Sequence, residues 1–94
     1  MRKIEEQMKL AVETATNWAG SNTTVSYNAD NSTSYIFLHG NHIASYRHTT
    51  DELEVNSDTL AEYPTNTTKS RLRALGANVA TRKGITYLDG VAVA

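Results

Sequence analysis

The feature that most constrains the fold is a pair of strand-forming runs joined at a Gly-Asn dipeptide. Residues 34–47 read Ser-Tyr-Ile-Phe-Leu-His-Gly-Asn-His-Ile-Ala-Ser-Tyr-Arg, with Gly40 and Asn41 near the middle. Glycine accepts the positive φ of a tight turn, so a Gly-Asn pair between two such runs predicts a two-residue hairpin loop. The other elements are therefore expected to pack around a central β-hairpin.

A Gly40-Asn41 loop would give the hairpin one aromatic face and one aliphatic face, because side chains alternate along a strand. The pairs expected on the aromatic face are Tyr35 with Tyr46, Phe37 with Ala44, and His39 with His42. Those expected on the other face are Ile36 with Ser45 and Leu38 with Ile43. Because a packed helix needs an aliphatic surface, we expect Ile36, Leu38 and Ile43 to be buried. The aromatic face would then be partly exposed, or covered by a partner or by the C-terminal segment.

The segments around the hairpin predict two helices and further strands. Residues 2–19 form an amphipathic pattern that ends at Gly20, with Glu5 on the polar face and these residues on the apolar face: Ile4, Met8, Ala11, Val12, Ala15, Trp18 and Ala19. A second helix is expected over 68–75, capped by Asn66 or Thr67 and closed by Gly76, with Leu72 and Leu75 inward. Strands are expected at 22–28, 52–56, 78–81, 85–88 and 91–93, and an ordered connection at 57–65.

These elements predict a single domain over residues 1–94 of the α+β class. The expected architecture is one antiparallel sheet in the order αββββαββ, packed against the N-terminal helix and the second, short helix. The chain has no cysteine, which excludes disulfides and thiolate metal sites. It has no long apolar run and no apolar block near its N-terminus, so we expect a cytoplasmic protein that does not enter a membrane.

The three histidines invite a metal site, but their spacing argues against one. By strand parity His39, His42 and His48 should lie on the same side of the hairpin. His48 would nevertheless be roughly 20 Å from His42, at about 3.3 Å per residue. The hairpin contains no carboxylate that could complete a site. We therefore expect no metal and no cofactor.

The sequence also lacks the usual elements of a catalytic site. No serine lies in a glycine-flanked elbow, and there is no phosphate-binding loop. The acidic residues between 51 and 62 are typical of a solvated surface rather than of a carboxylate pair tuned by burial. A non-enzymatic protein is therefore expected.

Basic residues gather in the last third of the chain. Five of the nine, Lys69, Arg71, Arg73, Arg82 and Lys83, fall within fifteen positions. The first three would face outward from the second helix, behind Thr67, and the other two would lie at a hairpin tip. A helix followed by a basic hairpin is typical of winged DNA-binding domains, so a nucleic-acid-binding module is the alternative function. Against it, the residues before Pro64 do not predict the preceding helix of a helix-turn-helix, and the formal charge is −1.

Two segments together resemble a group of small accessory proteins of tailed bacteriophages. They are the "Leu-His-Gly-Asn" hairpin at 36–44, and the "Thr-Thr-Lys-x-Arg-Leu" helix at 65–75 with the strand that ends in Tyr-Leu at 82–88. The likeness leaves out the N-terminal helix and transfers no catalytic residue. It implies a phage-encoded protein in the bacterial host cytoplasm. Such proteins often bind a host factor, including defence factors, and inhibit or redirect it.

A small binding protein that contacts a host protein is therefore the first expectation. Aromatic clusters contribute most to interface energetics, so the predicted partner-binding surface is Tyr35, Phe37, His39, His42 and Tyr46. Self-assembly, including a homodimer, is a third possibility, because an unpaired edge strand can add to a neighbour's sheet.

Overall fold

The computed structural model describes residues 1–93 and confirms the α+β class. The elements follow the order α1 (Lys3–Glu13), β1 (Trp18–Gly20), β2 (Thr23–Asn28), β3 (Thr33–Leu38), β4 (Asn41–Arg47), β5 (Glu52–Val55), α2 (Ser57–Glu62), α3 (Asn66–Ala74), β6 (Val79–Arg82), β7 (Ile85–Leu88) and β8 (Val91–Ala92). The N-terminal helix, the central hairpin and the later helix and hairpin are all present.

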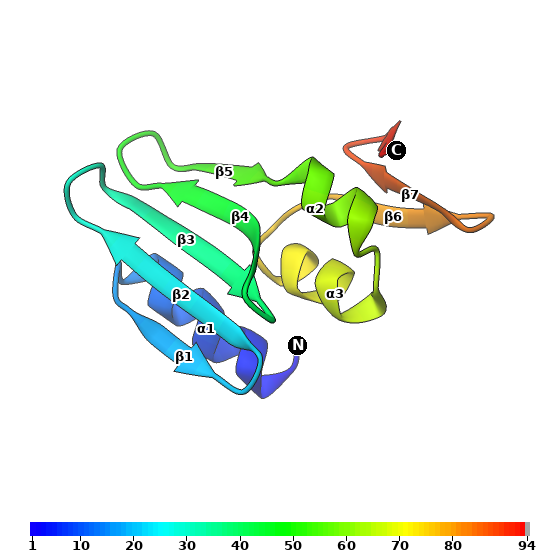
Figure 1. Ribbon diagram of the computed structural model, residues 1–94. Coiled ribbons are helices and arrows are strands. Elements are labelled where there is room, and N and C mark those ends of the chain that lie inside the picture. Colours follow the sequence, from blue (N-terminus) through cyan, green and yellow to red (C-terminus); the bar gives the residue numbers. More distant parts are fainter. Residues whose placement is uncertain (94) are drawn as a thin grey trace.

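The strands form two antiparallel sheets rather than the expected single one. Five strands lie in the order β1-β2-β3-β4-β5, and the last three form a separate sheet in the order β6-β7-β8. Figure 1 shows α1 behind the five-stranded sheet and the β6–β7 hairpin extending away from it. The two helices α2 and α3 intervene between β5 and β6 along the chain.

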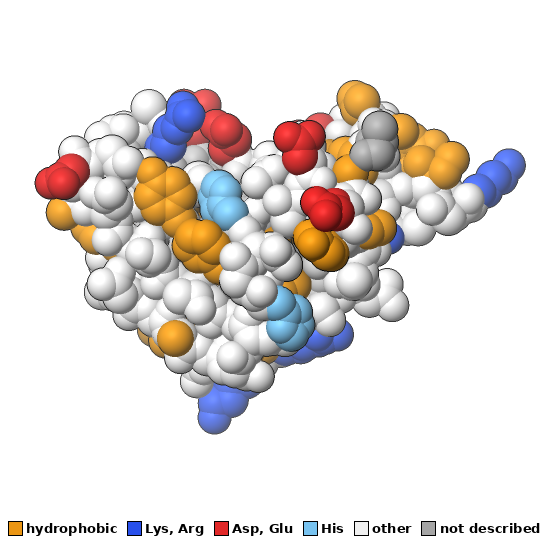
Figure 2. Space-filling model, viewed as in Figure 1, with side chains coloured by type: hydrophobic (Ala, Val, Ile, Leu, Met, Phe, Trp, Pro, Cys, Tyr) orange, Lys and Arg blue, Asp and Glu red, His pale blue; other side chains and the backbone are white. Residues whose placement is uncertain are grey.

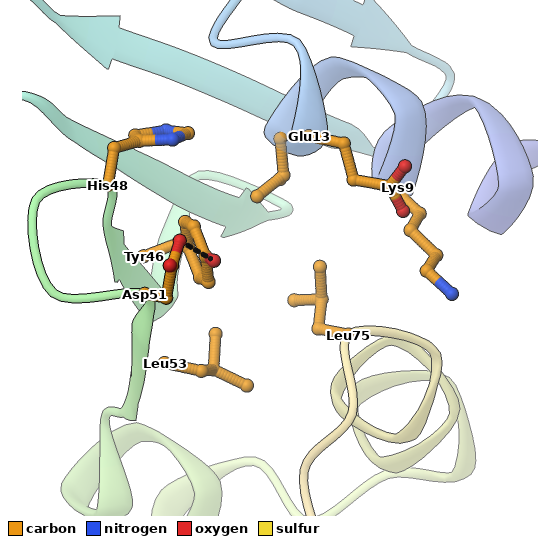
Figure 3. Close-up of a pocket in the computed structure, with 8 residues that line it drawn as sticks. Lys9, Glu13, Tyr46, His48, Asp51, Leu53 and Leu75 are labelled. Atoms are coloured by element: carbon orange, nitrogen blue, oxygen red, sulfur yellow. Dashed lines mark hydrogen bonds between the residues drawn. The ribbon is translucent and has the colours of Figure 1, made fainter.

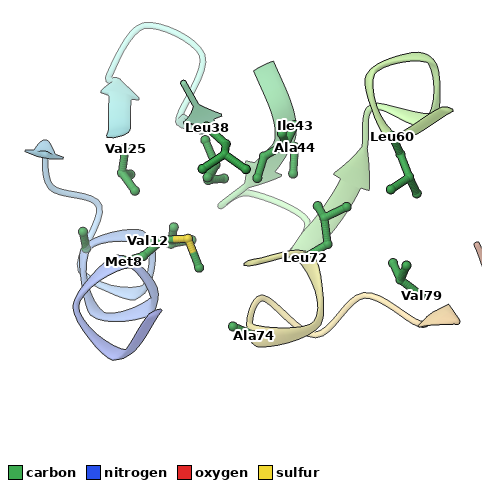
Figure 4. Close-up of a cluster of buried hydrophobic side chains, with 12 residues drawn as sticks. Met8, Val12, Val25, Leu38, Ile43, Ala44, Leu60, Leu72, Ala74 and Val79 are labelled. Carbon is green, nitrogen blue, oxygen red and sulfur yellow. The ribbon is translucent and has the colours of Figure 1, made fainter. Parts of the chain in front are cut away.

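The core lies between the five-stranded sheet and the helices (Figure 4). Met8 and Val12 of α1 pack with side chains of the sheet, and Leu60 of α2 and Leu72 of α3 extend the same cluster. The predicted burial of Ile36, Leu38 and Ile43 is confirmed, with exposures of 0%, 4% and 2%. We call the sheet face that carries these aliphatic residues the inner face and the opposite one the outer face.

The first helix ends at Glu13, so its prediction to residue 19 was wrong at the C-terminal end. Thr14 donates from its backbone N–H and its Oγ1 to the Leu10 carbonyl, and Ala15 adopts a φ of 54°. Trp18 already belongs to β1, where it pairs with Val25 of β2. Threonine and asparagine disfavour helix interiors, and the Asn17 Oδ1 accepts a hydrogen bond from the Tyr27 N–H at 2.7 Å. The helix therefore ends at these polar residues, although the helical spacing of apolar residues continues to residue 19.

The predicted hairpin is present, but its loop lies one residue earlier. His39 and Gly40 both have positive φ, 51° and 79°, as a type I′ turn requires, and Leu38 pairs with Asn41. A bulge follows, because Phe37 pairs with His42 whereas Ile36 pairs with Ala44. Ile43 is the extra residue, so both Ile43 and Ala44 are buried.

Because of the bulge, the residues of β4 that follow it face the opposite side of the sheet from the side predicted. Tyr35 pairs with Ser45, and Ser34 pairs with Tyr46. The predicted Tyr35–Tyr46 pair is therefore wrong, and the two rings lie on opposite faces of the sheet.

Residues 57–65, predicted as a connection, contain the helix α2. The Asn56 side chain caps it by accepting a hydrogen bond from the Thr59 N–H at 3.2 Å, and Leu60 anchors it in the core. The cap of α3 is Thr65, whose Oγ1 accepts from the Thr68 N–H at 3.1 Å, rather than Asn66 or Thr67. Two tight turns follow α3, at Lys83-Gly84 and Asp89-Gly90, and in each of them both residues have a positive φ.

Candidate functional site

Three aromatic side chains meet on the outer face. Tyr35 and Phe37 point outward from β3, because the buried Ser34, Ile36 and Leu38 alternate with them. His42 is the cross-strand partner of Phe37, and its ring centroid lies 5.5 Å from that of Phe37 and 5.7 Å from that of Tyr35. We call Tyr35, Phe37 and His42 the aromatic cluster.

Hydrogen bonds orient two members of the aromatic cluster. The His42 Nε2 lies 2.8 Å from the Ser45 Oγ, and the Asn31 Nδ2 donates to the Tyr35 hydroxyl at 2.8 Å. Neither Ser45 nor Asn31 was among the predicted site residues. The predicted register placed Ser45 opposite Ile36, on the other face of the hairpin. In the structure Ser45 lies opposite Tyr35, on the outer face.

The aromatic cluster remains partly exposed, and charged and polar residues surround it. All three rings are half-buried, and Figure 2 shows hydrophobic and histidine side chains together on the face that looks outward in Figure 1. Beside them lies the exposed Arg47–Glu54 ion pair, at 3.0 Å. An apolar centre with a polar rim is the usual anatomy of a protein-binding surface.

The other two residues of the predicted partner-binding surface lie elsewhere. His39 is exposed in the β3–β4 turn, away from the aromatic cluster. Tyr46 lies on the inner face, where its hydroxyl donates to the Asp51 Oδ1 at 2.9 Å. This hydrogen bond, partial burial and the charges of Asp51 and Glu13 raise the pKa of Tyr46 above its ordinary value.

The three histidines do not share one side, so that expectation was wrong. The His48 ring packs edge-on against Tyr46 and Tyr27 on the inner face, and its Nε2 lies 2.8 Å from the Ser34 Oγ. His42 belongs to the outer face. Over residues 1–93, no group of three or more His, Asp or Glu side chains is close enough to hold a metal ion.

The basic helix predicted as a nucleic-acid surface is largely interior, and this corrects the outward orientation expected for Lys69 and Arg71. Lys69 is 7% exposed and donates from Nζ to the Thr81 Oγ1 at 2.6 Å. Arg71 is 3% exposed. Both side chains therefore hold the fold together instead of facing solvent.

Arg71 forms the centre of a buried polar network. Its Nη1 pairs with the Glu5 Oε2 at 2.8 Å, and its other nitrogens donate to Thr23 and Asn22. Ser70 donates to the same Glu5 oxygen at 2.6 Å. Burial alone would raise the pKa of Glu5, but the hydrogen bonds from Ser70 and Arg71 lower it below its ordinary value. The network joins α1, α3 and the β1–β2 turn.

Three of the predicted basic residues are exposed: Arg73, Arg82 and Lys83. The Arg73 Nε donates to the Val79 carbonyl, and the Arg82 guanidinium lies 5.8 Å from the centre of the Tyr87 ring. Thr67 is half-buried on α3. The helix whose absence argued against a helix-turn-helix is present as α2, immediately before α3.

Comparison with known proteins gives one family. The family described as Kyanoviridae Gp96 protein matches residues 1–93. The chain belongs to this family. It is therefore a phage protein, and the phage origin implied by the sequence resemblance is confirmed. Searches of curated proteins and of solved structures gave no significant match.

The matched residues include the N-terminal helix, which the resemblance left out, and both segments that carried it. In this phage protein the "Leu-His-Gly-Asn" segment forms the β3–β4 turn, and the "Thr-Thr-Lys-x-Arg-Leu" segment lies in α3. Within residues 1–93, none of the helices has the length and apolar character needed to cross a membrane.

Proposed function

We propose that this phage protein is a non-enzymatic binding protein that works in the cytoplasm of the bacterial host. It binds a host protein through the outer face and inhibits or redirects that protein, for example a defence factor. The observation that carries the proposal is the aromatic cluster, three touching rings left half-buried on a sheet face.

The chemistry of the outer face supports a protein partner. Rigid rings bury a large area at a low cost in side-chain entropy, which is why aromatic residues are enriched at binding hot spots. Hydrogen bonds to Asn31 and Ser45 already orient two of the rings. A partner therefore meets a surface that is largely preorganised, which lowers the entropy lost on binding.

The test is a pull-down from host lysate with the tagged protein, with and without nuclease, followed by a measured affinity for the captured protein. The double substitution Tyr35→Ser and Phe37→Ser is expected to weaken binding at least about 30-fold, since hot-spot truncations cost about 2 kcal/mol or more. The matched control is Ile85→Ser with Val91→Ser, which removes two exposed apolar side chains from the other sheet.

The two variants distinguish specific binding through the outer face from nonspecific hydrophobic adsorption. The proposal requires that the control variant binds as the wild type does, and that nuclease leaves capture unchanged. Equal loss in both variants would exclude the outer face as the binding surface. Circular dichroism melts of both variants verify that each is folded.

A nucleic-acid-binding module remains the second candidate, because α2, α3 and the β6–β7 hairpin follow one another as in a winged helix and Arg82 and Lys83 lie at the hairpin tip. A salt-titrated gel shift tests it. The double substitution Arg82→Ala and Lys83→Ala should abolish a steeply salt-dependent shift. Arg71 is unsuitable for this test, because its loss would disturb the core.

A further inference from the structure

The five-stranded sheet has a free edge at β5. Among the strands of residues 1–93, β4 is the only neighbour of β5, and Figure 1 shows the opposite edge of β5 open. The Asn56 N–H donates to the Ile43 carbonyl at 2.8 Å. Because hydrogen-bonded pairs alternate along an antiparallel ladder, the two glutamates of β5 are the residues that bond to β4. The N–H and C=O groups of Leu53 and Val55 therefore point to the free edge.

These four backbone groups are available to another strand. Within residues 1–93, no hydrogen bond from a turn, a loop or a cap reaches them. Proline or a bulge often blocks pairing at a sheet edge, but β5 contains no proline and its pairing with β4 is regular. Two donors and two acceptors at alternate residues match the backbone of an added antiparallel strand.

Two grooves border this edge on the inner face. One has a volume of about 300 Å³, and Leu53 and Leu75 both point into it (Figure 3). The other, of about 200 Å³, lies between Leu53 and Val55 on one side and Ala77 and Leu88 on the other. Leu53 and Val55 are only half-buried. Every second side chain of an added strand would point to this face, where the grooves can accept it.

The outer-face side of the same edge is acidic. Glu52 and Glu54 are both exposed, and the register with Arg47 and Ser45 places both on the outer face. Arg47 pairs with Glu54 at 3.0 Å, and neither ion pair among residues 1–93 includes Glu52. A strand beside β5 would therefore meet apolar side chains on one face and carboxylates on the other.

This pattern distinguishes a foreign strand from a second copy of β5. Antiparallel pairing of two β5 strands would place glutamate opposite glutamate, in the registers that keep Leu53 and Val55 on one face and align most of the strand. Like charges directly opposite each other destabilise a sheet, whereas opposite charges stabilise it. The edge therefore favours a strand in which apolar residues alternate with basic ones.

We propose that the β5 edge binds an extended segment of a partner protein, which adds to the five-stranded sheet as a further strand. Apolar residues of the segment pair with Leu53 and Val55 and enter the grooves, and its lysine or arginine residues lie beside Glu52 and Glu54. Backbone hydrogen bonds supply the affinity in this mode of recognition, and alternate side chains supply the specificity. The edge does not include the aromatic cluster, so this inference does not depend on the proposed function.

The test uses a synthetic peptide with blocked ends, Lys-Val-Lys-Val-Lys-Val-Lys, and two versions of it that are methylated on backbone nitrogens. One version is methylated at two valines and the other at two lysines. The valine N–H groups would face β5, because the valines pair with Leu53 and Val55, and the lysine N–H groups would face away. Methylation at the valines is therefore expected to weaken binding at least about fivefold more than methylation at the lysines.

Amide hydrogen exchange, followed by NMR, locates the bound peptide. The N–H groups of Leu53 and Val55 should exchange at least about tenfold more slowly in saturating unmethylated peptide. The amides of β1, at the other edge of the sheet, should be unchanged. The acidic counterpart Glu-Val-Glu-Val-Glu-Val-Glu should bind about three- to tenfold more weakly than the lysine peptide.

Variants of the protein test the same edge. Val55→Pro removes one outward N–H, and proline is tolerated in an edge strand at such a position. It should weaken peptide binding at least about fivefold, whereas Val55→Thr, which retains the N–H and the branched shape, should bind within about twofold of the wild type. Tyr35→Ser with Phe37→Ser should bind the peptide as the wild type does, which separates this edge from the outer face. Circular dichroism melts verify that each variant is folded.

Three outcomes would overturn the proposal. The first is equal binding of the two methylated peptides, and the second is protection of the β1 amides in place of those of Leu53 and Val55. The third is protection of Leu53 and Val55 in the free protein that increases with protein concentration, because it would assign the edge to a second copy of the chain.

Discussion

At the scale of single residues, an ion pair lies in the interior of the molecule. The side chains of Glu5 and Arg71 are each 4% exposed. They are 66 positions apart in the chain, so their contact joins α1 to α3.

The buried pair makes a direct prediction about stability. Glu5→Gln is expected to lower the free energy of unfolding by about 3 kcal/mol, because it leaves the Arg71 guanidinium buried without its counter-charge. Urea denaturation measures this difference. Glu54→Gln is the matched control, since it breaks the exposed Arg47–Glu54 pair and should cost less than about 1 kcal/mol. Similar losses in the two variants would show that the Glu5–Arg71 pair contributes no more than a surface pair does.

The same carboxylate predicts a loss of stability in acid. The pKa of Glu5 is lower in the folded protein than its ordinary value of 4.5, so below that value the unfolded chain binds more protons than the folded one. The stabilisation by Glu5 is therefore complete above about pH 5 and is lost as the pH falls through the folded pKa. Urea midpoints measured from pH 7 to pH 3 should fall less steeply for Glu5→Gln than for the wild type. Parallel curves would contradict this prediction.

The burial of this ion pair was not predicted from the sequence. Arg71 was expected on an exposed basic helix and Glu5 on the polar side of α1, yet the two side chains are buried together. Periodicity within one helix shows which face is polar, but it cannot show that two polar faces meet each other. The apolar positions Met8, Val12 and Leu72 were predicted correctly, because burial of apolar groups needs no particular partner.

At the scale of elements, the central hairpin shows what the sequence could and could not predict. The two strands and the buried Ile36, Leu38 and Ile43 were correct, because strand-forming composition and an adjacent glycine were sufficient. The register was wrong for two reasons. In a type I′ loop the preferred glycine is the second residue, which favours His39-Gly40, and a bulge at Ile43 depends on packing that no local pattern shows. Tyr46 was therefore assigned to the wrong face.

The type I′ loop predicts a stabilising substitution. His39 has a φ of 51°, a conformation in which asparagine is strongly preferred, and Asn-Gly is the most favourable type I′ pair. His39→Asn should raise the free energy of unfolding by about 0.5 kcal/mol. Gly40→Ala, at a φ of 79°, should lower it by about 1 kcal/mol. Thermal melts of the two variants should move in opposite directions, and a His39→Asn variant that melts below the wild type would exclude this account of the turn.

At the scale of the whole molecule, the two sheets differ in how firmly the core holds them. Val25, Ile36 and Leu38 of the large sheet are buried, whereas β8 has two residues and both are exposed. The small sheet is joined to the rest through the buried Val79, through the partly buried Leu88, and through hydrogen bonds from Lys69 to Thr81 and from Arg73 to the Val79 carbonyl. Segments with few buried contacts open locally at low free energy. We therefore expect the backbone amides of β6 to β8 to exchange with solvent faster than those of β3.

Removing the Lys69–Thr81 hydrogen bond should increase the difference in amide exchange rate between the small sheet and β3. Thr81→Val keeps the shape and strand propensity of the side chain but leaves the buried Lys69 ammonium without its acceptor, at a cost of about 1–3 kcal/mol. Amide exchange in β6 to β8, followed by mass spectrometry, should become at least about fivefold faster while β3 is unchanged. Thr24→Val is the matched control, because Thr24 is exposed on β2. If β3 accelerated as much as β6, the small sheet would open only with the whole molecule, and Lys69 would belong to one cooperative core.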